Sequence, residues 1–90
     1  MKPPPFLSEC NPESRLYPSD WKWAYYKLQG GITEDGYQCP RCERRFFGPS
    51  DFAELHGDHR VSWSQGGRTT WDNLCLLCGP CNLRKSASSV

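Results

Sequence analysis

Two cysteine pairs of identical spacing are the residues whose chemistry is most directly readable in this chain. Cys39 and Cys42 form one C-x2-C pair, and Cys78 and Cys81 form another. Each pair can turn both sulfur atoms inward over one tight turn, so that two pairs close a tetrahedron of thiolates around Zn²⁺. The sequence therefore predicts a structural Zn²⁺ site made by these four residues.

The second pair has two alternative uses. Cys75 lies three residues before Cys78, so these two form another possible register. We prefer Cys78 with Cys81, because the Gly-Pro step between them suits a knuckle, whereas Cys75 lies in an apolar strand where a buried thiol is common. Cys-Gly-Pro-Cys is also typical of thioredoxin-like redox centres, but only nine residues follow Cys81, too few for the remainder of that fold. We assign no role to Cys10.

A second group of chemically capable residues lies between and just after the cysteine pairs. In chain order it consists of Asp58-His59, Gly66-Gly67, Asn73-Leu74, Asn82 and Lys85. Asp58 and Asn82 offer hard oxygen ligands suited to Mg²⁺ or Mn²⁺. His59, with an ordinary pKa of about 6.5, can be neutral at pH 7 and accept a proton from water. A base for water and a Lewis-acid ion are what phosphodiester hydrolysis requires.

In this order and spacing, these residues resemble the motif of HNH endonucleases. The resemblance covers residues 37–86, and Asn82 at the last position makes the chain similar to the HNN variant. It implies a small α+β domain of the ββα-metal (His-Me finger) type, in which a hairpin and a helix grip one catalytic divalent ion. It further implies that His59 is the general base and that Asp58 and Asn82 hold the ion. Asn73 would brace the loop and orient His59 without being a ligand.

The activity implied by the resemblance is that of a metal-dependent endonuclease on double-stranded DNA. Hydrolysis by one-metal catalysis would leave 5′-phosphate and 3′-hydroxyl ends, and a monomer or weak dimer with one site per domain would nick. A phage or restriction protein is a candidate partner. Candidate phosphate contacts are Arg60, Arg68, Arg84 and Lys85. The alternative is a non-catalytic zinc-binding module for nucleic acid or protein, which explains the cysteines but not the second group.

The adjacency of Asp58 and His59 raises a geometric question. Successive residues of a regular strand point to opposite faces, so both can serve one site only if the strand twists or bulges. Gly57, immediately before them, could permit a bulge. Strict alternation instead places His56 beside Asp58, which makes His56 a rival for the metal or base role.

The elements that position these residues are short, and the first precedes the first cysteine pair. Residues 1–18 predict a Pro-rich tail, either disordered or wrapped around the domain. Ser19-Asp20 is typical of a helix N-cap, and Gly30-Gly31 of a helix end. One face of this helix is expected to pack against the zinc core, and it consists of Trp21, Ala24, Tyr25 and Leu28. On other faces, Trp23 and Tyr26 are expected to pack against the tail.

The rest of the α+β fold is expected between and after the cysteine pairs. The sequence predicts a loop over 48–51, a strand over 52–62 and a second loop over 64–70 around Gly66-Gly67. Leu74 to Leu77 predicts a short buried strand, and Pro80 suits the first position of a closing helix that ends near Ser86. Residues 86–90 are expected to fray. Together with the resemblance, these elements predict one HNH nuclease domain over 19–90, with an added N-terminal helix.

Composition sets the limits of this interpretation. Ninety residues allow one domain, whose small core needs a staple such as the metal site, and the chain has six cysteines. No apolar run approaches the 18 residues of a membrane span, and the first residues lack a signal-type apolar region. We therefore expect a cytoplasmic protein with reduced thiols. Four thiolates and one Zn²⁺ lower the formal charge of +1 by two, so net charge argues neither for nor against nucleic acid.

Overall fold

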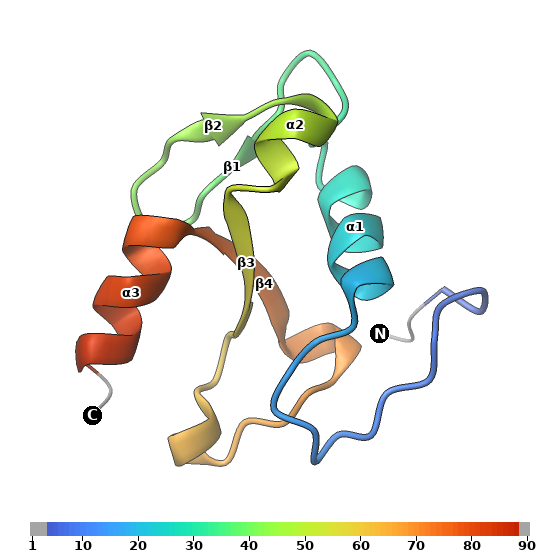
Figure 1. The fold of residues 1–90 in the computed structure, drawn as a ribbon, viewed down its shortest axis with the longest axis vertical. Coiled ribbons are helices and arrows are strands. Elements are labelled where there is room, and N and C mark those ends of the chain that lie inside the picture. The colour runs from blue at the N-terminus through green and yellow to red at the C-terminus, as the bar shows by residue number, and fades with distance from the viewer. Residues whose placement is uncertain (1–3, 89–90) are drawn as a thin grey trace.

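The structure is a computed structural model that describes residues 4–88, with side chains described up to residue 85. It contains three α-helices, four strands and two 3₁₀ turns within that range (Figure 1). In chain order these are α1 (Ser19–Leu28), β1 (Tyr37–Gln38), β2 (Arg45–Phe46), α2 (Gly48–Phe52), β3 (Leu55–His59), η1 (Trp63–Gln65), η2 (Trp71–Asn73), β4 (Leu74–Cys78) and α3 (Gly79–Ser88).

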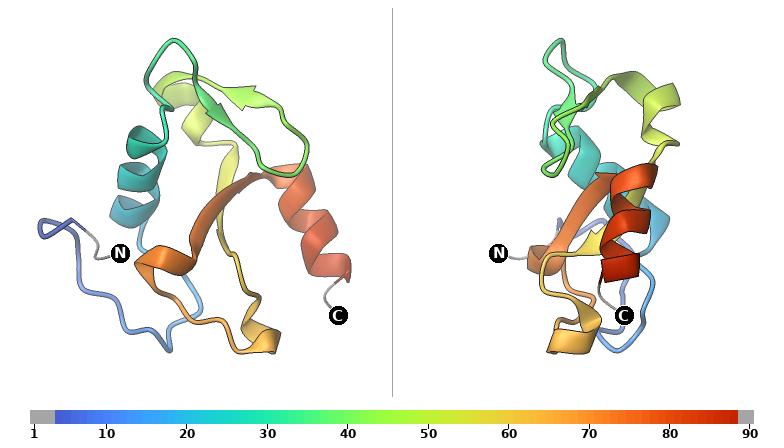
Figure 2. Two further views of the ribbon diagram at one scale, coloured as in Figure 1. Left: turned by 180° about the vertical axis from the view of Figure 1, so that it is seen from behind. Right: turned by 90° about the vertical axis from the view of Figure 1, so that its left-hand side faces the viewer.

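Two antiparallel hairpins carry the architecture. β1 pairs with β2, and β3 pairs with β4 in an unbroken register that runs from Leu55 opposite Cys78 to His59 opposite Leu74. The β3–β4 hairpin lies between α1 and α3 (Figures 1 and 2), and α3 contacts both of its strands, whereas α1 contacts β4. A hairpin followed directly by a helix is the ββα arrangement, so the predicted α+β fold class is confirmed.

The core is centred on β4, all of whose residues are buried. Its Leu-Cys-Leu-Leu-Cys sequence has no polar side chain to hydrate, which suits a strand covered on both faces. Tyr37 reaches it from β1, and its hydroxyl donates to the Leu76 carbonyl oxygen at 2.6 Å. This hydrogen bond allows the polar tip of a buried tyrosine to remain satisfied.

The buried face of α1 differs in part from the prediction. Trp21, Ala24 and Tyr25 are buried as expected, but Leu28 is 65% exposed and Tyr26 is completely buried. Tyr26 does not pack against the tail, because its ring lies against Phe52 of α2 and its hydroxyl donates to the Gly48 carbonyl oxygen at 2.8 Å. The face is rotated toward α2, a helix that the sequence did not predict.

The start of α1 also differs from the prediction. The N-cap position is Pro18, without a side-chain hydrogen bond, and Ser19 is already helical. The Asp20 carboxylate instead accepts hydrogen bonds from the backbone N–H and the hydroxyl of Ser8, both at 2.8 Å. Asp20 therefore fastens the N-terminal segment to the helix and does not cap it.

The segment before β3 corrects two further predictions. Residues 48–52 form α2 where a loop was expected, and the predicted strand over 52–62 shrinks to Leu55–His59. Pro49 suits the first turn of a helix, and the Asp51 carboxylate accepts the Phe47 backbone N–H at 2.8 Å, which satisfies a donor at the helix start. At the other end of the chain, α3 continues to Ser88, and the predicted fraying of 89 and 90 lies outside the described residues.

The N-terminal segment packs on the domain from residue 4 onward. The Trp21 indole N–H donates to the Ser8 carbonyl oxygen at 2.7 Å, and the Thr69 backbone N–H donates to that of Pro12 at 3.0 Å. Tyr17 is buried, and its hydroxyl donates to the Thr70 carbonyl oxygen at 2.9 Å. The segment thus bridges α1 and the loop between β3 and β4. No helix within the described residues has the length and apolar character to cross a membrane.

Candidate functional site

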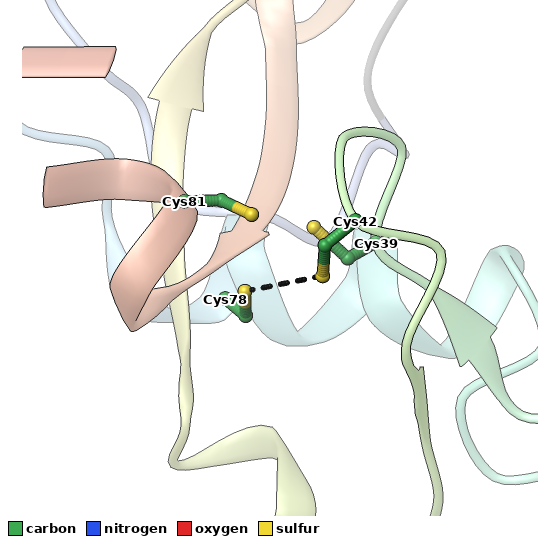
Figure 3. A group of neighbouring side chains, drawn as sticks. All are labelled: Cys39, Cys42, Cys78 and Cys81. Carbon is green, nitrogen blue, oxygen red and sulfur yellow. Dashed lines mark hydrogen bonds between the residues drawn. The ribbon is translucent and has the colours of Figure 1, made fainter. Parts of the chain in front are cut away.

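Four cysteine side chains meet at one end of the β3–β4–α3 unit (Figure 3). The Sγ atoms of Cys39, Cys42, Cys78 and Cys81 all lie within 4.8 Å of one another, and those of Cys42 and Cys78 are 3.6 Å apart. Four thiolates at about 2.3 Å from Zn²⁺ would be separated by roughly 3.8 Å in a tetrahedron. The side chains therefore fit a zinc ion with only small adjustments.

Local backbone geometry presents each pair of sulfur atoms. The first pair lies on the turn between β1 and β2, where the Cys39 N–H donates to the Arg44 carbonyl oxygen and the Glu43 N–H donates to that of Cys39, both at 2.9 Å. Glu43 closes this knuckle in the left-handed conformation, with φ of 67°. Cys78 ends β4 and Cys81 lies in the first turn of α3, so the strand-to-helix junction brings the second pair inward.

The environment of the cluster favours thiolates at some positions and thiols at others. Burial raises the pKa of Cys39, but backbone N–H groups of Cys78, Cys42 and Arg41 outweigh burial and lower it to about 6. Burial raises the pKa of Cys78 to about 12. A group of four sulfurs cannot carry four negative charges cheaply without a cation. The cluster is therefore suited to a divalent ion that is bound by deprotonated ligands.

Cys75 lies outside this cluster. Its thiol is buried, burial raises its pKa to about 11, and its Sγ lies 3.9 Å from an oxygen of Asp58. The alternative register of Cys75 with Cys78 is therefore wrong. Cys10 is half-buried against the core and is likewise no member of the cluster.

The end of β3 carries Asp58 and His59 on opposite sides of the strand. Pairing with β4 is continuous through both residues, so β3 has no bulge there. Of the two distortions that could let both residues serve one site, only strand twist remains. Gly57 serves another purpose, because a Cβ there would lie 2.8 Å from Cδ of Lys22, whose side chain crosses at that point. Asp58 faces α3, whereas His59 faces the N-terminal segment and the loop after β3.

The Asp58 carboxylate is held by α3. Its Oδ2 accepts a hydrogen bond from the Lys85 ammonium, and the same ammonium donates to the His59 carbonyl oxygen at 2.6 Å. Both side chains are largely buried, at 16% and 23% exposed. Lys85 thus ties the end of β3 to α3 at one point. Lys85, which was predicted to contact phosphate, is thus already paired with Asp58.

The His59 ring is fixed by a chain of hydrogen bonds. Its Nε2 lies 2.8 Å from the Thr69 hydroxyl oxygen, and that hydroxyl donates its single hydrogen to the Ser14 carbonyl oxygen. The hydroxyl must therefore accept from His59, which places the proton of the neutral ring on Nε2 and leaves the Nδ1 lone pair available. Tyr17 and Trp63 flank the ring, at centroid distances of 4.8 and 5.9 Å.

Burial and charge both act on the protonation of His59. Burial lowers its pKa, the Asp58 carboxylate opposes this, and the positive charges of Lys85 and Arg15 lower it further. The net effect is to hold the pKa of His59 below its ordinary value of about 6.5. At neutral pH the imidazole is therefore in the form that accepts a proton.

Asn73 closes the loop that follows β3. Its side-chain oxygen accepts the Val61 N–H at 2.9 Å, and its amide nitrogen donates to the carbonyl oxygens of Val61 at 3.1 Å and Arg68 at 2.9 Å. Gly66 has a left-handed φ of 94°. At Gly67 a Cβ would collide with the Val61 carbonyl oxygen. The Gly-Gly step therefore lets the loop close tightly on Asn73, whose contacts are with this loop and not with the His59 ring.

Asn82 and His56 line a shared cleft. Asn82 lies one helical turn before Lys85 on α3, and the cleft brings it beside His56 and Gly57 of β3. His56 is exposed, and its Nε2 is the atom nearest to a Cβ built on Gly79, at 3.5 Å. Asp58, Asn82 and His56 thus all lie at the β3–α3 junction, whereas His59 approaches from the opposite face of the strand.

The remaining arginines predicted to contact phosphate each have an intramolecular contact. Arg60 donates to the Tyr25 hydroxyl at 2.8 Å, and Arg84 donates to Sγ of Cys81 at 3.2 Å. Arg68 pairs with Glu13 at 3.3 Å and lies over the Trp63 ring at 4.4 Å. Arg60 and Arg84 remain exposed, so these contacts do not bury their charge.

Three residues of the site were missed at the level of sequence. Thr69, which is completely buried, orients His59, and Tyr17 and Arg15 reach His59 from the N-terminal segment. A threonine after a Gly-Gly step carries no signal of its own, and a Pro-rich segment gives no register for its contacts. Only the fold brings them within reach.

Comparison with known proteins gives one match. The family model described as HNH endonuclease matches residues 39–88, which contain both cysteine pairs and the complete β3–β4–α3 unit. No curated protein sequence and no solved structure matches the chain.

Proposed function

The chain belongs to the HNH endonuclease family, and we propose that it nicks double-stranded DNA by metal-dependent hydrolysis of a phosphodiester bond. Nucleases of this family act on DNA and use divalent metal ions. The observation that carries the proposal is the contact between Asp58 of β3 and Lys85 of α3. It ties the candidate carboxylate ligand to the helix that presents Asn82 one turn earlier.

Asp58 and Asn82 would hold the catalytic ion, Mg²⁺ or Mn²⁺. A carboxylate and an amide oxygen are donors of the type that these ions prefer, and two protein ligands leave room for phosphate and water. When bound, such an ion supplies Lewis-acid stabilisation of the charge that develops on the phosphate. The four cysteines, all soft thiolate donors, would hold Zn²⁺ in a closed structural site.

His59 is the proposed general base, and the accepting atom is Nδ1. Because Nε2 is committed to Thr69, the lone pair on Nδ1 is the one that can take the proton of the attacking water. The lowered pKa of the ring keeps it neutral at pH 7. After transfer, the Asp58 carboxylate stabilises the imidazolium, since its charge raises the pKa of His59.

Two further residues have proposed positioning roles. Lys85 orients the Asp58 carboxylate through Oδ2 and leaves Oδ1 for the ion. Asn73 holds the loop from 61 to 68, which carries Trp63 against the His59 ring. Neither role requires contact with DNA.

Plasmid nicking under graded chelation tests the proposal. Wild-type protein is expected to convert supercoiled plasmid to open circles in Mg²⁺ or Mn²⁺, and a mild chelator should stop the reaction while zinc content and circular dichroism stay unchanged. Activity and fold would then be lost at different chelator strengths, because four thiolates bind far more tightly than two oxygen ligands. Binding of DNA without nicking under any metal would favour the non-catalytic zinc module instead.

A further inference from the structure

A cleft of about 310 Å³ adjoins the candidate active site on the side of the N-terminal segment. It opens between four parts of the chain: the N-terminal segment, α1, β3 and α3. Its lining consists of Arg15, Leu16, Tyr17, Lys22, His56, Gly57 and Asn82. Asn82, a proposed ligand of the catalytic ion, therefore belongs to both places.

The charge of this cleft is of one sign. Arg15 and Lys22 are its two full charges, and no aspartate or glutamate lines it. Within residues 4–85, whose side chains are described, neither cation forms an ion pair. Arg44, Arg68 and Lys85, in contrast, each pair with a carboxylate. Uncompensated positive charge in a concave site attracts anions.

Both cations are held in place by packing. The Arg15 guanidinium lies over the Trp63 ring, 5.1 Å from its centroid. The Lys22 stem crosses β3 at Gly57, the position where a Cβ would lie 2.8 Å from its Cδ. Tyr17, anchored through its hydroxyl to Thr70, also lines the cleft. Such packing lowers the entropy that would be lost when an anion binds.

We propose that this cleft is a phosphate subsite for the DNA backbone, in which Arg15 and Lys22 contact a phosphate neighbouring the one that is cleaved. The inference rests on the proposed nuclease function, because DNA is the substrate which that function assigns. It deepens that function by making the N-terminal segment, which lies outside the residues matched to the family, part of the DNA-binding surface. His56 and Asn82 complete the cleft as hydrogen-bonding groups.

The test measures binding of a short DNA duplex by fluorescence anisotropy over a series of salt concentrations, without added divalent ion. Arg15→Gln and Lys22→Gln should each weaken binding roughly five- to tenfold near 0.1 M salt, and each should reduce the slope of log K against log salt by about 0.9. Arg15→Lys should retain the wild-type slope, because a point charge also neutralises phosphate. Zinc content and Tm confirm that each variant is folded.

Two matched variants distinguish an effect of the cleft on DNA binding from an effect of the net charge of the protein. Lys27→Gln removes one charge from α1 outside the cleft, where Lys27 is exposed over Trp23, and should leave the slope nearly unchanged. Gly57→Ala keeps every charge but displaces the Lys22 stem, so it should reduce the magnitude of the slope of log K against log salt. If Lys27→Gln weakens binding as much as Lys22→Gln, or if Arg15→Gln and Lys22→Gln bind like wild type, the subsite does not exist.

Nicking assays on the same variants distinguish this inference from the nuclease proposal. Wild-type nicking with an unchanged KM in Arg15→Gln and Lys22→Gln would overturn the subsite and leave the nuclease intact. Absence of nicking by the wild type and by every variant, together with Arg15- and Lys22-dependent binding of the duplex, would overturn the nuclease and support the phosphate subsite.

Discussion

The two ends of the β3–β4–α3 unit both place candidate ligands for a cation, but they do so in opposite ways. At the zinc end, four identical ligands come from the β1–β2 turn and the β4–α3 junction, and their sulfur atoms lie within 4.8 Å of one another. At the proposed catalytic end, the side chains are of several types and are held by different segments. Asp58 is held by α3, His59 by the N-terminal segment through Thr69, and Asn73 by the intervening loop.

This difference separates stability from chemistry. A structural Zn²⁺ contributes on the order of 10–16 kcal/mol in small peptides, as much as the net stability of a typical domain, roughly 5–15 kcal/mol. Single hydrogen bonds at the other end contribute about 0.5–1.5 kcal/mol each, or about 1.5–3 kcal/mol where a charged group takes part. We therefore expect changes at the zinc end to abolish the fold, and changes at the catalytic end to reduce turnover in a protein that remains folded.

The largest effect is expected from Cys78→Ser. Loss of one thiolate from the closed cluster should release zinc and unfold the domain, because its small core cannot replace the energy of the metal site. Zinc content and thermal denaturation followed by circular dichroism measure this. Cys10→Ser is the control, since Cys10 lies outside the cluster, and it should keep zinc and Tm. A folded, zinc-free Cys78→Ser protein would remove the distinction between the two ends.

A smaller but still large effect is expected from Asp58→Asn. The amide can still accept from Lys85 but lacks the charge that would hold a divalent ion, so nicking should fall by on the order of 100-fold. Tm should fall, because Lys85 loses its partner's charge, but by much less than in Cys78→Ser. If Tm falls as far as in Cys78→Ser, Asp58 is a structural residue and the catalytic end is not energetically separate.

Thr69→Val should have an intermediate effect on the rate. Without its hydroxyl, His59 is no longer fixed with the proton on Nε2, and nicking should fall roughly tenfold. Thr69→Ser keeps the hydroxyl and should restore the wild-type rate and pH profile. A valine variant with normal nicking would show that the hydrogen bond from His59 to Thr69 has no part in the reaction.

The smallest expected effect is a displacement of the pH profile. The base form of His59 is present above its pKa and is lost as pH falls through that value. Because burial lowers the pKa and the charges of Lys85 and Arg15 lower it further, the acid limb of kcat against pH should have its midpoint below 6.5. A bound divalent ion would act in the same direction. A midpoint above 6.5 would mean that Asp58 dominates the environment of His59.

The same comparison explains how much could be predicted from the sequence. The zinc end depends on local spacing, so Cys39, Cys42, Cys78 and Cys81 were identified directly, and so were the buried strand at β4 and the helix after it. The nuclease residues were recognised by resemblance. Their orientation was not predictable, because it depends on contacts between positions far apart in the chain.

Particular residues show where prediction stopped. The bond from Thr69 to the Ser14 carbonyl oxygen joins positions 55 apart, and Tyr26 is buried because α2 forms against it. Local alternation indicates only that Gly57 could permit a bulge, and none forms. The glycine instead accommodates Lys22 from α1, an interaction that no local pattern specifies.

The central claim is that His59 performs chemistry at an end of the molecule that is energetically independent of the zinc site. The most direct test compares plasmid nicking by wild type and His59→Ala in Mg²⁺ or Mn²⁺, at equal zinc content and after both Tm values have been measured. We predict that wild type nicks, and that His59→Ala is slower by about 10²- to 10⁴-fold while its zinc content stays the same. Equal nicking by both proteins, or nicking by neither, would contradict the claim.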